Sequence, residues 1–132
     1  MKYLFSLIFM LLISFSMDAQ KINTFTGSDT IVNTATVNLD YAHAGSFASG
    51  AFQVVNTKIG GTAAGKTYFM GSVDGVNYVK LDSLTNTNQT TNTKIFIESP
   101  PTKAFYRFST TGSGTMSVIT SATCHFKGER IK

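Results

Sequence analysis

The sequence predicts an all-β protein, a two-sheet antiparallel β-sandwich of jelly-roll-like form with about eight strands. Apolar and polar residues alternate with a period of two over much of the chain, as in strands that bury one face. Clusters of Gly, Asn, Asp, Ser and Pro separate these stretches, as turns require. Threonine, whose branched Cβ favours strands over helices, is the commonest residue.

Residues 1–19 precede the sandwich and are typical of a secretory signal peptide. Lys2 supplies the positive start, residues 4–15 are apolar apart from two serines, and small and polar residues follow as far as Ala19. The apolar run is shorter than the ~20 residues that span a bilayer. We therefore expect cleavage after Ala19 and a single β-sandwich domain over 20–132, with a retained membrane anchor or a buried helix as the alternatives.

The strands are expected, in chain order, at 21–25, 34–41, 50–59, 66–73, 76–81, 94–98, 103–110 and 115–127. The second of these shows the pattern most simply. Its apolar residues Ala35, Val37, Leu39 and Tyr41 alternate with polar ones, which predicts one buried and one solvated face.

The connections between strands carry their own signals. Asp74-Gly75 lies between the fourth and fifth expected strands and predicts a two-residue hairpin turn, because both residues tolerate a positive φ. The Thr/Asn-rich tract 85–93 precedes the sixth strand and predicts an exposed loop or an edge segment.

The last strand predicts the core most clearly. Met116, Val118, Ala122, Cys124 and Phe126 share one face, and serines, threonines and a histidine share the other. Each large apolar side chain that is fully buried contributes ~1.5–3 kcal/mol. Six phenylalanines are expected to fill the core: Phe52, Phe69, Phe96, Phe105, Phe108 and Phe126.

Composition excludes several classes of protein. A chain of 132 residues suits one domain, and a single cysteine excludes a disulfide framework and a multi-cysteine zinc site. The net charge of +4 comes from basic residues that are scattered singly, so nucleic-acid binding is not indicated.

One match to a nucleotide-binding motif is expected to be accidental. Residues 60–67, GGTAAGKT, fit the phosphate-binding loop G-x-x-x-x-G-K-[ST], whose mechanism needs a helix directly after the final threonine. The residues that follow predict a strand instead. We expect a loop between strands and no bound nucleotide.

Catalytic and metal-binding groups are sparse. The acidic residues form no opposed pair of the kind that a glycosidase needs, although a calcium site shared by Asp74, Asn77 or Asp82 is an alternative to a simple turn. His43 and His125 have no second metal ligand at a regular spacing. We expect Cys124 to be a buried, inert thiol, with an intermolecular disulfide as the alternative. No enzyme and no cofactor are predicted.

Binding is therefore expected at exposed loops or edge strands. The candidate loops are 42–49, 60–66 and 85–93, and the residues expected to make contacts are His43, Ser46, Lys66, Asp74, Asn77, Asn88 and Thr90. An aromatic platform for sugars is an alternative, although alternation buries most of the aromatic residues and tryptophan is absent.

Two segments carry a resemblance to known proteins. Residues 67–81, TYFMGSVDGVNYVKL, and 104–118, AFYRFSTTGSGTMSV, together resemble small β-sandwich virion proteins of bacterial viruses and repeats of secreted bacterial surface proteins. That resemblance implies a module that builds or decorates a particle, with no catalytic residues. The predicted leader departs from the virion pattern and favours a membrane-containing virus or a host surface protein.

The sequence thus predicts a non-enzymatic structural or attachment module outside the cytoplasm, as a minor virion structural protein or a protein of the cell surface. Its expected partners are other proteins or further copies of itself, with a glycan as a further partner. The alternative is a secreted carbohydrate- or surface-binding module that acts alone.

Overall fold

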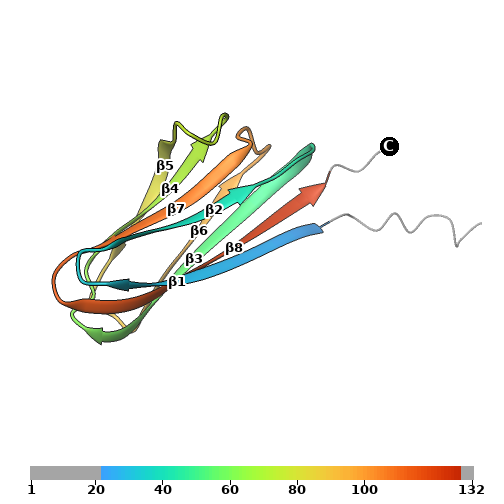
Figure 1. Cartoon of the computed structure of the whole chain (residues 1–132). Helices are drawn as coiled ribbons and strands as arrows, with labels where there is room; N and C mark the ends of the chain where they lie inside the picture. Colours follow the sequence, from blue (N-terminus) through green and yellow to red (C-terminus); the bar gives the residue numbers. More distant parts are fainter. Residues whose placement is uncertain (1–21, 129–132) are drawn as a thin grey trace, which may run out of the picture.

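The computed structural model describes residues 22–128, which form eight β-strands and no helix (Figure 1). The strands are β1 (Ile22–Val32), β2 (Thr36–Ala42), β3 (Phe47–Gly61), β4 (Gly65–Ser72), β5 (Val79–Asn86), β6 (Thr91–Glu98), β7 (Phe105–Gly112) and β8 (Met116–Gly128). The predicted leader, residues 1–19, lies outside the described residues. Within residues 22–128, no helix has the length and apolar character needed to cross a membrane.

The strands form two four-stranded antiparallel sheets. Sheet 1 has the order β1-β8-β3-β6 and sheet 2 the order β2-β7-β4-β5. Successive strands alternate between the sheets except for β4 and β5, which are neighbours in sheet 2. This strand order is that of a jelly roll, so the predicted fold class is confirmed.

The sandwich has two ends, and every connection lies at one of them (Figure 1). At the terminal end, where β1 begins and β8 finishes, lie the β2–β3, β4–β5 and β6–β7 connections. At the opposite, distal end lie the β1–β2, β3–β4, β5–β6 and β7–β8 connections.

Two of the expected strands have the wrong bounds. The first was predicted at 21–25, but β1 continues to Val32, because its far half pairs with β8 even though Gly27, Ser28 and Asp29 break the apolar alternation. The fifth was predicted at 76–81, but β5 begins only at Val79 and continues into the Thr/Asn-rich tract.

The predicted two-residue turn at Asp74-Gly75 is also wrong. β4 ends at Ser72 and β5 begins at Val79, so six residues connect them. Gly75 has a φ of 73°, but Asp74 does not have a positive φ. The cause is the Asp74 carboxylate, which accepts hydrogen bonds from backbone N–H groups farther along the chain and so holds open a longer loop.

The core lies between the sheets and follows the predicted alternation. On β8, the five predicted residues are buried, and Thr120 joins them on the same face. The larger apolar cluster consists mainly of aromatic residues, and rings from the two sheets meet at its centre, with the Phe52 and Phe69 centroids 4.8 Å apart. Phe105 is the exception among the predicted core phenylalanines, because it is only half-buried and packs against the β4–β5 loop at Gly75.

A buried polar cluster adjoins the apolar core. The Asn56 side-chain amide of β3 donates to Thr67 Oγ1 of β4 at 2.8 Å and to Asn86 Oδ1 of β5 at 2.7 Å. Thr120 Oγ1 of β8 donates to Asn56 Oδ1 at 2.5 Å, and Thr110 of β7 lies 2.9 Å from Thr67 through their hydroxyl oxygens. These hydrogen bonds connect the two sheets through the interior.

Candidate functional site

The predicted contact residues lie at opposite ends of the sandwich and form no single site. His43, Ser46, Asp74 and Asn77 belong to connections at the terminal end. Lys66 is the second residue of β4 at the distal end, where Asn88 and Thr90 lie in the β5–β6 connection. Each end therefore has to be considered by itself.

At the terminal end, His43 has a packing role. Its ring is partly buried, lies 4.7 Å from the ring centroid of Phe126 and stacks on Tyr106 at 5.9 Å. A hydrogen bond of 2.7 Å joins its Nε2 to the carbonyl oxygen of Lys103, so the side chain ties the β2–β3 connection to the β6–β7 connection. Ser46 in the same connection is exposed.

Asp74 organises its own loop. Ser72 and Asn77 donate side-chain hydrogen bonds to its carboxylate at 2.7 Å, and the N–H groups of Val76 and Asn77 donate to it as well. These hydrogen bonds, with that of Ser72 the largest, hold the pKa of Asp74 well below its ordinary value. The third candidate calcium ligand, Asp82, pairs instead with Lys94 at 2.8 Å, and the lysine's hydrogen bond lowers the pKa of Asp82.

At the distal end, the candidate residues connect neighbouring turns. Asn88 Oδ1 accepts from Lys58 Nζ and from the backbone N–H of Ala63, both at 3.1 Å. The carbonyl oxygen of Thr90 accepts from the backbone N–H of Lys58 at 2.9 Å. The segments 60–66 and 85–93 therefore lie side by side. Much of the second segment, which was predicted as an exposed loop or an edge segment, belongs to β5 and β6, and its residues Asn86 and Asn92 are buried.

The geometry around residues 60–67 differs from that of a phosphate-binding loop. Gly60 and Gly61 end β3, and Gly65, Lys66 and Thr67 begin β4, so a strand follows the threonine. The hydroxyl of Thr67, which would bind the metal in such a loop, is fully buried and bonded to Asn56 and Thr110.

The described residues contain no group of three or more His, Cys, Asp or Glu side chains placed to hold a metal ion. Cys124 is fully buried on the inner face of β8, and this burial raises the pKa of its thiol to about 12. The prediction that Cys124 is buried is confirmed.

The outer face of sheet 2 carries charged, aromatic and hydroxyl side chains, and is called here the cationic face. Strand register places its twelve residues in three rows: Thr36, Thr111, Lys66 and Thr85; Asn38, Ser109, Tyr68 and Ser83; Asp40, Arg107, Met70 and Lys80. Arg107 donates to Asp40 through Nε at 2.5 Å and Nη2 at 3.0 Å, and lies 4.0 Å from the centre of the Tyr78 ring. The hydrogen bonds to Asp40 raise the pKa of Arg107.

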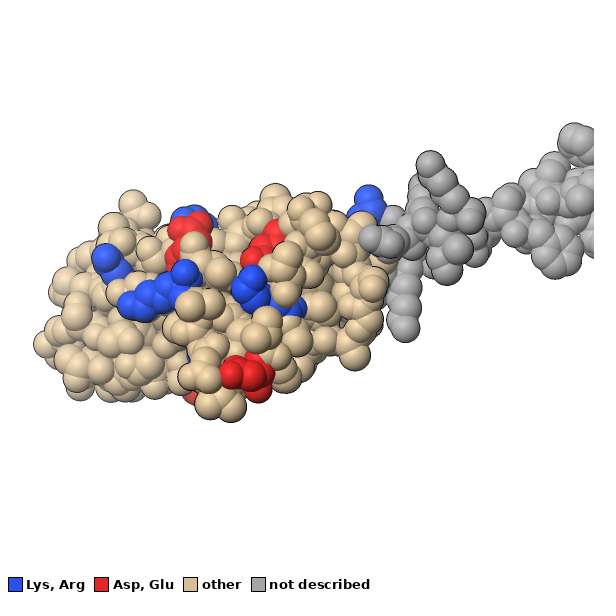
Figure 2. Space-filling view, turned by 90° about the horizontal axis from the view of Figure 1, so that it is seen from above, with Lys and Arg blue, Asp and Glu red and all other residues tan. Residues whose placement is uncertain are grey.

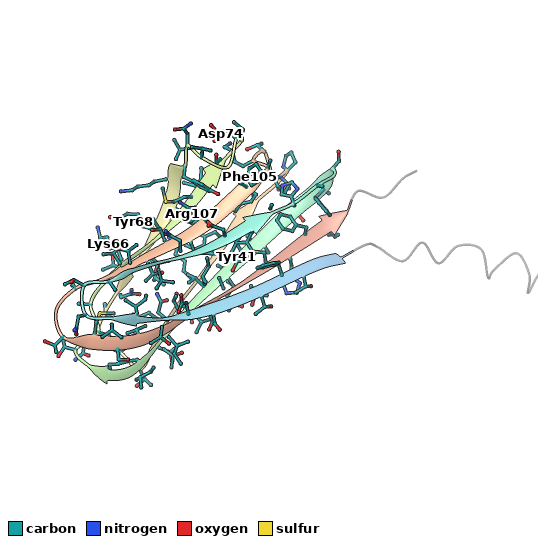
Figure 3. All side chains as sticks on the ribbon, in the orientation of Figure 1. Tyr41, Lys66, Tyr68, Asp74, Phe105 and Arg107 are labelled. Carbon is teal, nitrogen blue, oxygen red and sulfur yellow. The ribbon has the colours of Figure 1, made fainter. Side chains whose placement is uncertain are left out.

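Near the distal end, this face has a shallow depression. Its lining consists of Gly65, Lys66, Tyr68, Thr111, Gly112 and Ser113. Lys80 Nζ lies 3.9 Å from the centroid of the ring of Tyr68, which is half-buried, so the two side chains form a cation–π contact. Figure 3 shows Lys66, Tyr68 and Arg107 following one another along this side of the molecule. From the viewpoint of Figure 2, basic and acidic side chains are interspersed rather than sorted by sign.

The outer face of sheet 1 differs in composition, and is called here the uncharged face. Its four rows are Thr24, His125, Ala51 and Ile97; Thr26, Thr123, Gln53 and Ile95; Ser28, Ser121, Val55 and Thr93; Thr30, Ile119, Thr57 and Thr91. None of these sixteen residues is Lys, Arg, Asp or Glu. On the edge strand β6, Ile95 and Ile97 are 57% and 73% exposed.

Sequence reasoning did not find the uncharged face. Its strands β1, β8, β3 and β6 come from separate parts of the chain and are brought together only by the jelly-roll order. A signal was nevertheless present, because the alternate residues Thr24, Thr26, Ser28 and Thr30 all have short hydroxyl side chains, and the alternate residues from Thr91 to Ile97 are two threonines and two isoleucines, again without charge.

Comparison with known proteins supports the fold. No protein-family model and no curated protein sequence matches the chain. Among solved structures, a protein from work on disulfide-linked pili of Bacillus endospore appendages has a TM-score of 0.51 and 11% identity over 83% of this chain and 91% of that one. The SPBc2 prophage-derived protein YomS has a TM-score of 0.50 and 9% identity over 83% and 96%.

A third similar structure is the enzymatically active domain of tailspike protein 4 from bacteriophage CBA120. Its TM-score is 0.52 at 12% identity, over 80% of this chain but only 18% of that one. At these identities, the three similarities show a common β-sandwich fold and no more. The role of this chain has to be inferred from its own surface residues.

Proposed function

We propose that this chain is a non-enzymatic structural or attachment module that works outside the cytoplasm and holds a neighbouring protein or a second copy of itself against the uncharged face. A minor structural protein of a virion is the specific form that the sequence resemblance supports. The observation that carries the proposal is that none of these sixteen outward-facing residues of sheet 1 is charged, with Lys127 following them only at the terminal margin of β8.

That lack of charge is unusual for a surface exposed to water. Soluble surfaces normally intersperse charges of both signs, whereas the centres of protein interfaces are depleted of them. The cationic face on the other sheet has the mixed charges of a soluble surface, with Asp40, Lys66, Lys80 and Arg107 among its twelve residues. The uncharged face has the depletion of charge that is typical of an interface centre.

The β6 edge adds a means of association. An edge strand has unpaired backbone N–H and C=O groups, and proteins usually protect such an edge with charges or proline. In β6, Lys94 turns toward Asp82 of β5, while Ile95 and Ile97 remain exposed on the uncharged face. Partner contact can therefore combine apolar burial with backbone pairing at the same strand.

Placement outside the cytoplasm rests on the predicted leader, residues 1–19. N-terminal sequencing of exported material tests it: a first residue of Gln20 supports the proposal, and a first residue of Met1 or Lys2 contradicts cleavage.

Association through the uncharged face is tested with Ile95→Lys in the full chain. We expect the unmodified protein to form an oligomer, or to co-purify with particles, and Ile95→Lys to abolish both. Ser109→Lys, which adds the same charge to the cationic face, is the matched control. Light scattering coupled to size-exclusion chromatography over a range of concentrations gives the mass.

Two results would overturn association through this face. One is an unmodified protein that stays monomeric at every concentration and separates from particles. The other is equal loss of association in the Ile95→Lys and Ser109→Lys variants, which would assign the contact to overall charge.

A second candidate function is a secreted carbohydrate- or surface-binding module that acts as a monomer. The specific observation in its favour is the depression beside Tyr68, where an aromatic ring, hydroxyl groups and a lysine converge.

A further inference from the structure

The cationic face has more positive than negative charge, and two of its cations have no acidic partner. It contains Lys66, Lys80 and Arg107 against one carboxylate, that of Asp40, which is already paired with Arg107. Among residues 22–128, no carboxylate oxygen lies within ion-pair distance of Lys66 or Lys80. Both lysines are exposed.

The three cations are placed along the line of β4. Lys66 and Met70 are four residues apart on this strand, about 13 Å at ~3.3 Å per residue. Lys80 and Arg107 lie on either side of Met70, in register with it on β5 and β7. Lys80 extends over Tyr68, with Nζ 3.9 Å from the centroid of its ring, and Arg107 is paired with Asp40. Positive charge therefore runs from Lys66 past Tyr68 to Arg107 along a short track.

Between these cations, the track offers hydrogen-bonding groups and one aromatic ring. Tyr68 lies in register with Ser83 on one side and Ser109 on the other, and Asn38 is in register with Ser109. Thr111 and Ser113 contribute hydroxyl groups at the depression. Hydroxyl and amide groups suit the hydroxyl groups of a sugar, and an aromatic side chain suits its apolar C–H surface.

We propose that the cationic face binds an acidic polysaccharide, a sugar polymer bearing carboxylate or sulfate groups, along β4. Lys66 binds one acidic group, Lys80 together with Arg107 binds another, and Tyr68 packs against the sugar between them. This deepens the second candidate function by naming its ligand class. It rests on that second function and uses no residue of the uncharged face.

The small number of cations favours this ligand over a nucleic acid. Duplex DNA carries a phosphate every ~3.4 Å along each strand, so a face that has, among residues 22–128, two unpaired lysines and one paired arginine would leave most of its phosphates without a contact. A polymer whose acidic groups alternate with neutral sugar units matches a face on which a few cations lie among hydroxyl groups.

Titration calorimetry with the full chain tests the proposal. The probes are hyaluronate and unsulfated chondroitin, in which a uronic acid alternates with a neutral amino sugar, with uncharged dextran and an oligothymidylate for comparison. We expect binding to at least one of the two acidic polysaccharides, weakening as NaCl rises from about 50 to about 200 mM because part of the affinity is electrostatic. Dextran and oligothymidylate are expected to bind at least about tenfold more weakly.

Paired substitutions locate the site. Lys66→Ser with Lys80→Ser should weaken binding by about tenfold or more, because two of the three cations are removed. Tyr68→Ala should weaken it with the charge unchanged. Lys127→Ser removes an exposed cation at the terminal margin of sheet 1 and should leave affinity within about twofold. Thermal melting shows whether each variant keeps its fold.

The proposal is overturned if neither acidic polysaccharide binds, if oligothymidylate binds as tightly, or if Lys127→Ser weakens binding as much as the double variant. Its failure is distinguishable from that of the proposed function, because the Ile95→Lys variant tests oligomeric state and retains every residue of the cationic face.

Discussion

Asn56 is the residue on which the contact between the two sheets most depends. Its amide oxygen and nitrogen bond to side chains of β4, β5 and β8, and both hydrogen-bond partners of the nitrogen belong to the other sheet. A buried polar group has a strong preference for one geometry, since any shift leaves donors and acceptors without partners. This cluster therefore specifies how the sheets align, which apolar packing alone defines less sharply.

We predict that Asn56→Ala destabilises the protein by about 3 kcal/mol, because each buried polar group left without a partner costs ~1–3 kcal/mol. Urea denaturation measures the loss. Thr57→Ala, one position along β3 on the uncharged face, should change the free energy of unfolding by less than about 0.5 kcal/mol. A similar effect of both substitutions would argue against a structural role for the buried cluster.

Cys124 leads to a prediction about reactivity and pH. With a pKa near 12, only about one thiol in ten thousand is ionised at pH 8, and the thiolate is the reactive form. Because burial raises this pKa, the thiolate fraction stays low until the pH approaches 12 or the protein unfolds. Ellman's reagent should therefore react slowly with the native protein at pH 8 and completely in denaturant. Rapid stoichiometric labelling of the native protein would contradict the burial of the thiol.

At the scale of strands, prediction succeeds where one face of a strand is continuously buried. β8 is the clearest case, because its apolar residues recur at every second position from Met116 to Phe126 apart from Thr120. Prediction fails where no continuous apolar face marks the strand, or where a side chain and not the backbone closes the turn. The far half of β1 lacks an apolar face to detect, and Asp74 lengthens its loop through its own carboxylate.

Phe126 tests the register of β8. Phe126→Asp places a carboxylate beside the rings of Phe47 and Phe52, and we expect no soluble folded protein. Phe126→Ala should fold with a loss of about 3–5 kcal/mol. The adjacent control, Lys127→Asp, should leave soluble yield and melting temperature nearly unchanged. Unaltered melting of the Phe126 variants would show that this face of β8 is misassigned.

The end of β3 offers a matched pair of glycines. At Gly61, φ is +70° and a Cβ would lie 2.2 Å from the carbonyl oxygen of Thr115, whereas a Cβ at Gly60 would meet no atom within 4 Å. We expect Gly61→Ala to lower the free energy of unfolding by at least about 2 kcal/mol, because the left-handed conformation alone costs ~1–2 kcal/mol. Gly60→Ala should be neutral or stabilising by up to about 1 kcal/mol. Equal effects in denaturation would contradict the geometry at this turn.

At the scale of the molecule, the sequence predicted two sheets and their core but not which surfaces the fold would create. Period-two alternation shows which residues of a strand share a face, but strand order depends on pairings between distant segments, such as β1 with β8. The uncharged face exists only because of those pairings. Most of the expected contact residues belong to connections between strands, and these connections lie at the two opposite ends of the sandwich.

The pairing of distant strands also predicts cooperative unfolding. Both sheets contribute to one core, so we expect neither to be stable alone, and far-UV circular dichroism and tyrosine fluorescence should show coincident urea transitions. Two separated transitions would indicate that one sheet persists without the other. Folding is expected within milliseconds to seconds, the range of all-β proteins dominated by non-local contacts.

The start of β1 and the finish of β8 are hydrogen-bonded neighbours, with Ile22 opposite Lys127. A circular permutant therefore needs only a short bridge between these positions, and its new ends can open in the Ser113–Gly114 turn at the distal end of the sandwich. An affinity tag or fluorophore attached there would report from the end opposite the start of β1 and the finish of β8, so the orientation of the molecule on a larger assembly could be measured with a single label.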